Sequence, residues 1–585
     1  MKGLNRSGKR GLCILFLFVC AISAFSCSRP KTAGTPETGS VTKTRGAADT
    51  GRATDAGAAA DTGYSDIVTA PGVFPIVKAP YTLRIFTSQA PTIENFTTNA
   101  FTKSYEEKTG VHIEWEVAPA NSVWEKLNLS LTTGDYCDMY VQTGMSKQME
   151  ILYGSQGVFI PLNDLIEKYA PNIAQAFREH PEIRAMNTAP DGNLYSLPVL
   201  NTAPIVRAPC KLWMNTTWLK NLNLKVPQTT EEFYQVLKAF KERDPNGNGS
   251  GKNVIPFFCA DDTKSFFVEY FMNSFIQCNQ GNQGFMYVTD DDKVGVAYDK
   301  PEWRDGLMYL RRLVRDGLMD PASFSANQDE LKRVAENPGN MILGSTVWNT
   351  ISGFMDLYGD RQRNYDTIPP LQGPKGVRLT VYRADANCVT GATVITKALK
   401  NPEVAVRWLD YFFTLEGNLE MRIGRQGKEW RYPNPGELSY TGLPAEWVML
   451  SGIGGAQNYY WGQYGIAQYL RHDRQGANQD IYAPDGIERR LYEAYHTNYE
   501  PYLPKKALPG LYIPSDVQKK INQPMIDIKA YVQEALVRFC TDDLSLEKDW
   551  DSYVATLNKM GLNDIVKAHQ DAYNSYLANI AEFSR

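Results

Sequence analysis

A Gly-rich loop that begins at Asp244 carries the residues whose spacing comes closest to metal chemistry. Asp244, Asn246 and Asn248 place side-chain oxygens at alternate positions, and Gly249 follows at the sixth. Calcium loops of the EF-hand kind use this spacing and complete it with a glutamate at the twelfth position. The twelfth position here is Ile255, which offers no carboxylate. The three oxygen-bearing residues are therefore incomplete calcium candidates.

Motifs for catalysis are missing from the chain. It contains no G-x-S-x-G, no H-E-x-x-H and no P-loop, and its five histidines are dispersed. The cysteines beyond the leader are scattered without a C-x-x-C pair, which argues against a metal site and leaves their disulfide state open. We therefore expect a binding protein and not an enzyme.

The first residues predict export and lipid attachment. A basic stretch without acidic residues precedes an apolar run over residues 11–25, which is too short to span a bilayer. Residues 24–27, Ala-Phe-Ser-Cys, resemble a bacterial lipoprotein cleavage box. We expect a signal peptide over residues 1–26 and lipidation, with palmitate, at Cys27. The alternative is an ordinary secretory signal that is cut nearby.

A flexible tether is predicted to follow the lipid, over residues 27–78. Its first part, residues 28–63, is rich in Ala, Gly, Thr and Asp and has no aromatic residue, so it cannot bury enough apolar surface to fold. The folded domain is expected over residues 79–585. The protein would then lie on the extracytoplasmic side of the cell membrane, held only by its N-terminal lipid.

Composition limits the partners. The net charge of −4 and the absence of a basic cluster argue against nucleic acid. Aromatic residues make up 12% of the chain, with 33 tyrosines and 11 tryptophans, which suits a cleft that stacks rings on sugars. Most of these rings are nevertheless expected in the core. We expect a monomer.

The elements that must position such a cleft begin with an alternation of strands and helices. Hydrophobic periodicity predicts strands over 81–87, 111–117 and 138–142, with helices over 96–108 and 123–131 between them. This order implies parallel pairing, and ligands collect at the carboxyl ends of parallel strands. Those ends hold Ser88, Gln89, Ala118, Pro119, Gln142 and Thr143.

The middle and the end of the chain resemble a known family. Five segments follow one another in a characteristic order. They are the turn and strand at 191–198, Leu-Trp-Met-Asn at 212–215, the capping box Thr229-x-x-Glu232, the Asp244 loop and the apolar segment 254–258. Four later segments belong to the same pattern, at 369–374, 401–413, 549–553 and 570–573. The pattern is similar to that of extracellular solute-binding proteins (family 1) of carbohydrate ABC transporters, LipO/LplA-like lipoproteins and alginate-oligosaccharide-binding proteins, over about residues 80–585.

The resemblance implies a periplasmic-binding-protein-like type II α/β fold, with two lobes joined by a hinge (a Venus flytrap) and helices at the C-terminus, one of them over 524–539. Lobe one is expected over about 79–200 and 325–385, and lobe two over about 201–324 and 386–585. An oligosaccharide would bind between the lobes, and the receptor would deliver it to ABC transporter permease subunits. Two alternatives stay open: a secreted carbohydrate-active enzyme, and a sensory or peptide-binding lipoprotein of the same fold.

Within that fold, polar and aromatic groups at strand ends and in loops are the candidates for sugar contact, because sugars need hydrogen bonds and stacking planes. The expected ligand-binding residues are Gln89, Gln142, Asn201, Trp213, Trp348, Asn349, Tyr382, Glu429, Trp430 and Trp461. Four other tryptophans lie in helix or strand patterns and are assigned to the core: Trp115, Trp303, Trp408 and Trp447. The charge of the glycan stays open, because basic residues lie close by at Arg207, Lys211, Arg383 and Arg431.

The resemblance also sharpens the metal question. The alginate-binding relatives hold calcium in a loop of the form Asp-x-Asn-x-Asn-Gly-x-x-Asp-Glu. Here the last two positions are Lys252 and Asn253, so two carboxylates are lost and a cation takes the place of one. Because ligand charge controls calcium affinity, we expect no cofactor, with the Lys252 ammonium in place of the ion.

Overall fold

The structure is a computed structural model of the chain. It describes residues 65–247, 249, 253–261, 266–278, 284–450, 455–462, 465–477, 480–483 and 486–585. The signal peptide, Cys27, Asn248 and Lys252 lie outside the described residues.

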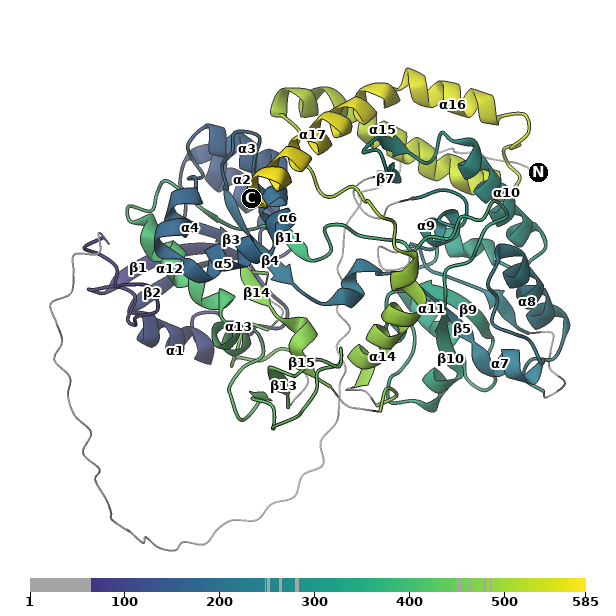
Figure 1. Cartoon of the computed structure of the whole chain (residues 1–585), viewed down its shortest axis with the longest axis horizontal. Coiled ribbons are helices and arrows are strands. Elements are labelled where there is room, and N and C mark those ends of the chain that lie inside the picture. The colour runs from purple at the N-terminus through teal and green to yellow at the C-terminus, as the bar shows by residue number, and fades with distance from the viewer. Residues whose placement is uncertain are drawn as a thin grey trace, which may run out of the picture.

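A six-stranded sheet forms the core of the first lobe, on the left in Figure 1. Its order is β14-β4-β11-β3-β1-β2. β1 pairs in parallel with both β2 and β3, which confirms the predicted arrangement. The strands are β1 (Tyr81–Ser88), β2 (Val111–Ala118), β3 (Met139–Val141), β4 (Ser196–Asn201), β11 (Cys388–Ile395) and β14 (Gln468–Leu470).

Helices and a small sheet complete the first lobe. The predicted helix over 96–108 begins only at Ala100, because the Asn99 side chain caps it by accepting from the backbone N–H of Phe101. The helices are α1 (Ala100–Thr109), α2 (Val123–Thr133), α3 (Lys147–Ser155), α4 (Asn163–Tyr169), α5 (Pro171–Glu179), α6 (Pro181–Asn187), α12 (Pro402–Asp410) and α13 (Leu415–Arg422). The small sheet contains β12 (Trp430–Arg431), β13 (Trp447–Met449) and β15 (Gln475–Gly476).

The second lobe contains a four-stranded sheet of order β10-β5-β9-β6, on the right in Figure 1. Its strands are β5 (Lys211–Asn215), β6 (Ile255–Phe257), β9 (Leu343–Trp348) and β10 (Tyr365–Ile368). A hairpin of β7 (Met286–Val288) and β8 (Val294–Val296) lies outside this sheet. The helices are α7 (Thr216–Asn221), α8 (Thr230–Glu242), α9 (Phe267–Met272), α10 (Pro301–Arg315), α11 (Gln328–Ala335) and α14 (Ile487–Ala494).

Strand pairing corrects the predicted division into lobes. Residues 325–385 were expected in lobe one, but β9 and β10 both pair with β5 in the second sheet. Residues 386–476 were expected in lobe two, but β11 pairs with β3 and β4, and β14 with β4. The chain passes between the sheets from β4 to β5, from β10 to β11 and from β14 to α14.

The predicted tether also ends earlier than expected. Residues 65–78 were assigned to it, but Val68, Ile76 and Val77 are at most 2% exposed and belong to the core of the first lobe. The guanidinium of Arg407 donates to the carbonyl of Ala70 at 3.0 Å. These apolar side chains bury enough surface to fold with the lobe.

The C-terminal helices α15 (Ser515–Cys540), α16 (Trp550–Lys559) and α17 (Leu562–Phe583) pack against the second lobe, and their apolar residues join its core. α15 begins well before the predicted start at Pro524, which lies inside the helix. α17 also contacts α6 of the first lobe, so it spans both lobes, as Figure 1 shows.

A buried carboxylate ties the C-terminal segment to the first lobe. Glu150 on α3 is fully buried, and its Oε2 accepts from the hydroxyl of Tyr512 at 2.5 Å and from that of Ser196 at 2.9 Å. The Lys147 ammonium lies 3.8 Å from the centre of the Tyr512 ring. Burial raises the pKa of Glu150, with smaller opposing contributions from Lys147 and the two hydroxyls.

The structure shows the state of the cysteines and whether a helix could cross a membrane, within the described part of the chain. Six cysteines lie there, and all are buried and unbridged. No helix in the described ranges has both the length and the apolar character needed to cross a membrane.

Candidate binding site

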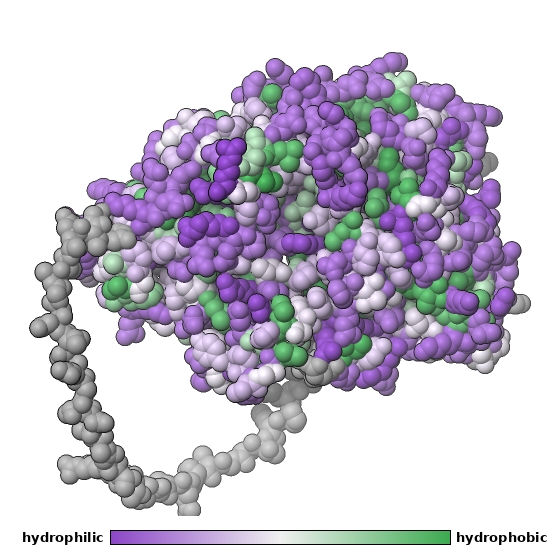
Figure 2. Space-filling model, viewed as in Figure 1, coloured by the Kyte–Doolittle hydropathy of each residue, from purple (hydrophilic) through white to green (hydrophobic). Residues whose placement is uncertain are grey.

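The site is built where strand ends of the two sheets face each other. β4 leaves the first sheet at Asn201 and leads through a short 3-10 helix (Pro204–Arg207) to the start of β5, so the carboxyl ends of β1 to β4 face the second lobe. The start of β5 meets the end of β9, since Lys211 pairs with Trp348. The surface is hollowed between the two halves in Figure 2.

Three predicted amides lie at the edge of the first sheet and are half-buried. Gln89 donates to the carbonyl of Ile93 at 2.9 Å, Gln142 accepts from the N–H of Gly465 at 2.7 Å, and Asn201 accepts from the N–H of Ala203 at 2.9 Å. Each amide thus orders a loop and still keeps one polar group without a partner among the described residues. Gln142 also has a φ of 51°, an unusual backbone conformation at the end of a strand.

The four tryptophans predicted to stack on a ligand are all core residues. Trp213, Trp348, Trp430 and Trp461 are at most 1% exposed. The indole N–H of Trp461 donates to Thr102, and that of Trp430 donates to the carbonyl of Gly424. In this conformation the four rings are packed on all sides and offer no face to a ligand, and their assignment to the site stays a prediction. Trp303, Trp408 and Trp447 are also buried, as expected, while Trp115 is half-buried.

The remaining three predicted residues occupy different places. Asn349 directly follows β9 at the facing edge of the second sheet and accepts from the N–H of Thr350 at 2.8 Å. Tyr382 is half-buried in the connection from β10 to β11. Glu429 accepts two bonds from the guanidinium of Arg425, at 2.5 and 3.1 Å, and one from its backbone N–H. The Arg425 bonds hold the pKa of Glu429 below its usual range.

Trp124 is a candidate site residue that sequence reasoning missed. It is the second residue of α2, shortly after the carboxyl end of β2, and a Cβ on Gly144, after β3, would lie 3.4 Å from its ring. Its side chain is 46% exposed, and no other tryptophan in the described ranges is classed as exposed. Its position directly after a predicted strand would have indicated this role, whereas its residue type alone would not.

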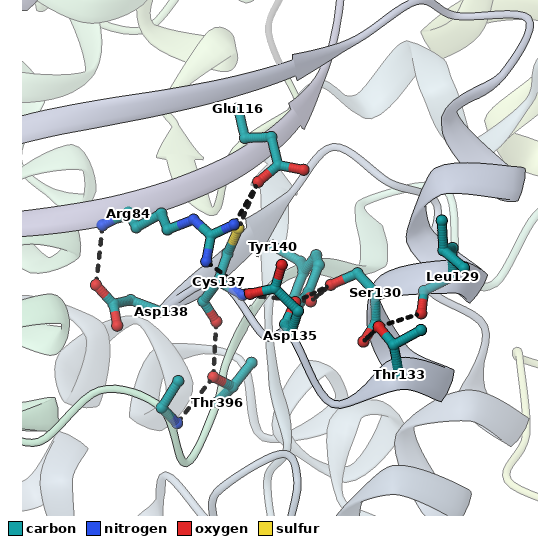
Figure 3. A network of polar contacts seen from close by, with 11 residues as sticks. Arg84, Glu116, Leu129, Ser130, Thr133, Asp135, Cys137, Asp138, Tyr140 and Thr396 are labelled. Carbon is teal, nitrogen blue, oxygen red and sulfur yellow. Dashed lines mark hydrogen bonds and ion pairs between the residues drawn. The ribbon is translucent and has the colours of Figure 1, made fainter.

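A polar network holds the C-terminal end of α2, opposite the end that carries Trp124 (Figure 3). Arg84 on β1 pairs with Glu116 and with Asp135, each at 3.0 Å. The loop that contains Asp135 is held to α2 through Ser130, whose hydroxyl donates to the Asp135 carbonyl at 2.6 Å. Ser130 also shares a 2.5 Å hydrogen bond with Tyr140 of β3. The helix that presents Trp124 is therefore rigidly attached to the sheet.

Tyr459 provides a second exposed ring at the same edge. Its side chain is 51% exposed, and its carbonyl accepts from the N–H of Phe101 at the start of α1. The guanidinium of Arg425 lies 4.4 Å from its ring centre. Since Glu429 holds Arg425, the role of this predicted carboxylate is to orient a cation against an aromatic ring.

The Asp244 loop keeps the turn of a calcium loop but not its ligands. The N–H of Gly249 donates to Asp244 at 2.6 Å. Asn246 uses its oxygen to accept from the indole N–H of Trp218 at 3.0 Å and its NH2 to donate to the carbonyl of Met341. The second oxygen of Asp244 is buried and has no hydrogen-bond partner among the described residues. In the described ranges no group of three or more His, Cys, Asp or Glu could hold a metal. Both polar atoms of the Asn246 side chain are already bonded to protein partners.

Two lobes with separate sheets, a hinge of several crossings and binding-competent side chains at the facing edges define a two-lobed solute-binding protein. Residues 87–418 match the family described as bacterial extracellular solute-binding protein, and the chain belongs to that family. The type II fold with its C-terminal helices is the one that the sequence resemblance implied.

Two curated relatives and two solved structures place the chain more closely. The fructooligosaccharide ABC transporter substrate-binding protein FusA of Streptococcus pneumoniae serotype 4 is 27% identical over 486 residues, 81% of this chain and 86% of FusA. Its structure in complex with kestose covers 85% of this chain and 100% of FusA, at 26% identity and a TM-score of 0.66. The lipoprotein LipO of Bacillus subtilis is 25% identical over 344 residues, 56% of this chain and 63% of LipO. The alginate-binding protein AlgQ2 without calcium shares the fold at 24% identity and a TM-score of 0.61, covering 85% of this chain and 99% of AlgQ2.

Proposed function

We propose that this protein is an extracytoplasmic receptor that binds an oligosaccharide between its two lobes and delivers it to an ABC transporter permease. The observation that carries the proposal is the pair of exposed rings, Trp124 and Tyr459, beside amides with unused polar groups at the same strand ends. Aromatic faces and amides are the groups that bind neutral, hydroxyl-rich rings. The similarity to FusA, named for fructooligosaccharides, supports the same ligand class.

Transport requires that the ligand select one conformation. An oligosaccharide that contacts Gln142 on one lobe and Asn349 on the other binds the closed state better than the open state. Its differential affinity for the two states shifts the equilibrium toward closure. The permease then has a distinct, ligand-loaded shape to recognise.

The test is to incubate the purified protein with a panel of oligosaccharides and measure both unfolding and glycan integrity. A receptor should unfold at a higher Tm with its ligand, because the ligand binds only the folded state, and the glycan should be recovered intact. Shortened glycan products would contradict the proposal and favour the secreted enzyme. A Tm that rises with peptides instead would favour the peptide-binding alternative.

Lipid anchoring through Cys27 is the second part of the proposal, and the protein is expected as a monomer with no other membrane contact. The residues 24–27 and the similarity to LipO support it. In a bacterial host, a palmitate analogue should label the wild-type protein and fail to label Cys27→Ser. Cys20→Ser is the matched control and should keep the label. Equal labelling of the wild type and the Cys27→Ser variant would exclude this anchor.

Calcium is not expected to contribute to this function. Because Asn246 is committed to Trp218 and the acidic positions are Lys252 and Asn253, the loop presents one carboxylate to an ion. The Tm should therefore be the same in millimolar calcium and in excess chelator. A rise of several degrees in calcium that Asp244→Asn removes would show a bound ion at this loop.

A further inference from the structure

A connecting segment ahead of α15, residues 508–514, is built into both lobes. Leu511 and Ile513, at 8% and 4% exposure, belong to the core of the second lobe. Tyr512 lies between them in the chain and is also 8% exposed, but it packs in a core of the first lobe with Phe86 of β1. Successive side chains therefore enter different lobes, and the segment is held by both.

Polar contacts fix Tyr512 to the first lobe. Its hydroxyl donates to a carboxyl oxygen of Glu150 on α3 at 2.5 Å and lies 3.2 Å from the carbonyl oxygen of Asn187 on α6. A Cβ on Gly510 would lie 3.6 Å from a carboxylate oxygen of Asp385, in the connection from β10 to β11. The segment therefore lies beside one of the connections that form the hinge.

α17 is the second element that both lobes hold. The ring of Tyr576 is half-buried and packs against the core of the second lobe and against that of the first. The guanidinium of Arg184 on α6 lies 4.6 Å from the centre of the Phe583 ring, at the end of α17. In Figure 1 this helix runs from α15 and α16 toward α6. Contacts with the first lobe thus extend along α17 from Tyr576 to Phe583.

The connections between the lobes are themselves tied together. The N–H of Arg383 donates to the carbonyl of Arg207 at 3.0 Å, and the N–H of Asn201 donates to the carbonyl of Asn387 at 2.9 Å. The connections from β4 to β5 and from β10 to β11 therefore form one strip. Such a strip can both bend and twist, so it does not by itself select one direction of lobe movement.

Residues that are fixed to both lobes do restrict that movement. When two rigid bodies rotate relative to each other, only points on the rotation axis stay in place in both. Protein cores are close-packed, so a side chain cannot follow one lobe without leaving the core of the other. Rotation about the line through Tyr512 and Tyr576 leaves both residues where they are. Rotation about another axis pulls at least one of them out of a lobe.

We propose that residues 508–514 and α17 form a C-terminal staple that confines lobe movement to rotation about an axis through Tyr512 and Tyr576. This inference goes beyond the proposed function, because it concerns the ligand-free protein and holds for any ligand.

The test measures the distance between the lobes in the ligand-free protein by double electron–electron resonance. Spin labels are attached to Glu107→Cys on α1 and Lys220→Cys on α7, two exposed positions. In Figure 1 both helices lie at the lower side of their lobes, away from α3 and α17. The mature chain carries Cys27→Ser, and the six cysteines of the described ranges are buried, so the labels react at the introduced thiols.

Tyr576→Ala removes the ring that contacts both cores. The distance distribution should broaden by several ångströms, because the lobes gain further directions of rotation. Leu577→Ala is the matched control, since Leu577 is also half-buried on α17 and packs against the core of the second lobe. Its distribution should match that of the wild type. Tyr512→Ala and Leu511→Ala form a second pair with the same expected contrast.

The outcomes decide for or against the staple. Circular dichroism and the Tm establish that each variant is folded, and Tyr576→Ala decides the question if Tyr512→Ala does not fold. Broadening in Tyr576→Ala with a wild-type width in Leu577→Ala supports the staple. A wild-type width in the folded Tyr576→Ala variant would overturn it, and so would equal broadening in Leu577→Ala. No glycan is added, so a protein that binds no oligosaccharide would overturn the receptor function and leave this result unaffected.

Discussion

Replacing Trp124 with alanine should weaken oligosaccharide binding by roughly 10- to 30-fold. A sugar that covers one indole face removes on the order of 60 Å² of apolar surface from water, worth about 1.5 kcal/mol, and lost dispersion contacts add to this. Because every 1.4 kcal/mol corresponds to about a tenfold change in Kd, the effect is easily measured by calorimetric titration. The Tm of the ligand-free variant should hardly change, since the ring is 46% exposed.

Two further variants make this prediction specific. Trp124→Phe keeps a smaller stacking face and should bind with intermediate affinity. Leu129→Ala removes an apolar side chain that is 62% exposed on the same helix, and it should bind like the wild type. An unchanged Kd in the folded Trp124→Ala variant would remove this ring from the site.

Replacing Glu150 with alanine should lower the free energy of unfolding by about 2–4 kcal/mol, the range for breaking a buried polar network and leaving a cavity. The hydroxyls of Tyr512 and Ser196 would lose their acceptor within a fully buried site. Urea denaturation followed by circular dichroism measures the effect. Glu107→Gln, an exposed carboxylate on α1, is the control and should change stability by less than about 0.5 kcal/mol. A loss no larger than that in Glu150→Ala would show that the network does not stabilise the fold.

The pH dependence of stability should carry the signature of the same carboxyl group. Burial raises the pKa of Glu150, so the folded state binds its proton more tightly than the unfolded state does. Its contribution is then complete below the ordinary glutamate value of about 4.3 and is lost as the pH rises through the raised value. Glu150→Gln cannot titrate, so the stability of the wild type relative to this variant should fall as the pH rises. A relative stability that rises with pH would show that the pKa is lowered instead.

The local elements of this protein could be predicted because their signals are local. Alternating apolar residues in 111–117 mark a strand wherever it pairs, and the capping box at Thr229 forms through contacts within a single helical turn. The parallel order of β1, β2 and β3 followed from the helices between them. The position of Gln89 and Gln142 at strand ends was predicted in the same way.

The structure departs from the interpretation of the sequence in properties that depend on distant residues. Trp213 and Trp348 look like ligand-stacking rings in the sequence, but each is buried by residues far away in the chain. Trp124 differs from them only in its surroundings. A tryptophan ring gains free energy equally by packing in a core or against a sugar, so residue type cannot separate the two roles.

The sequence by itself determined the family, the exported and lipid-anchored character that we expect, and the strands and helices with short-range signals. The tertiary structure alone decided that β9 and β10 belong to the second sheet and β11 and β14 to the first, and that the rings of Trp124 and Tyr459 are exposed. The physical reason is that periodicity and capping are set within a few residues, whereas strand partners, burial and unpaired polar atoms depend on which distant segments the hinge brings together.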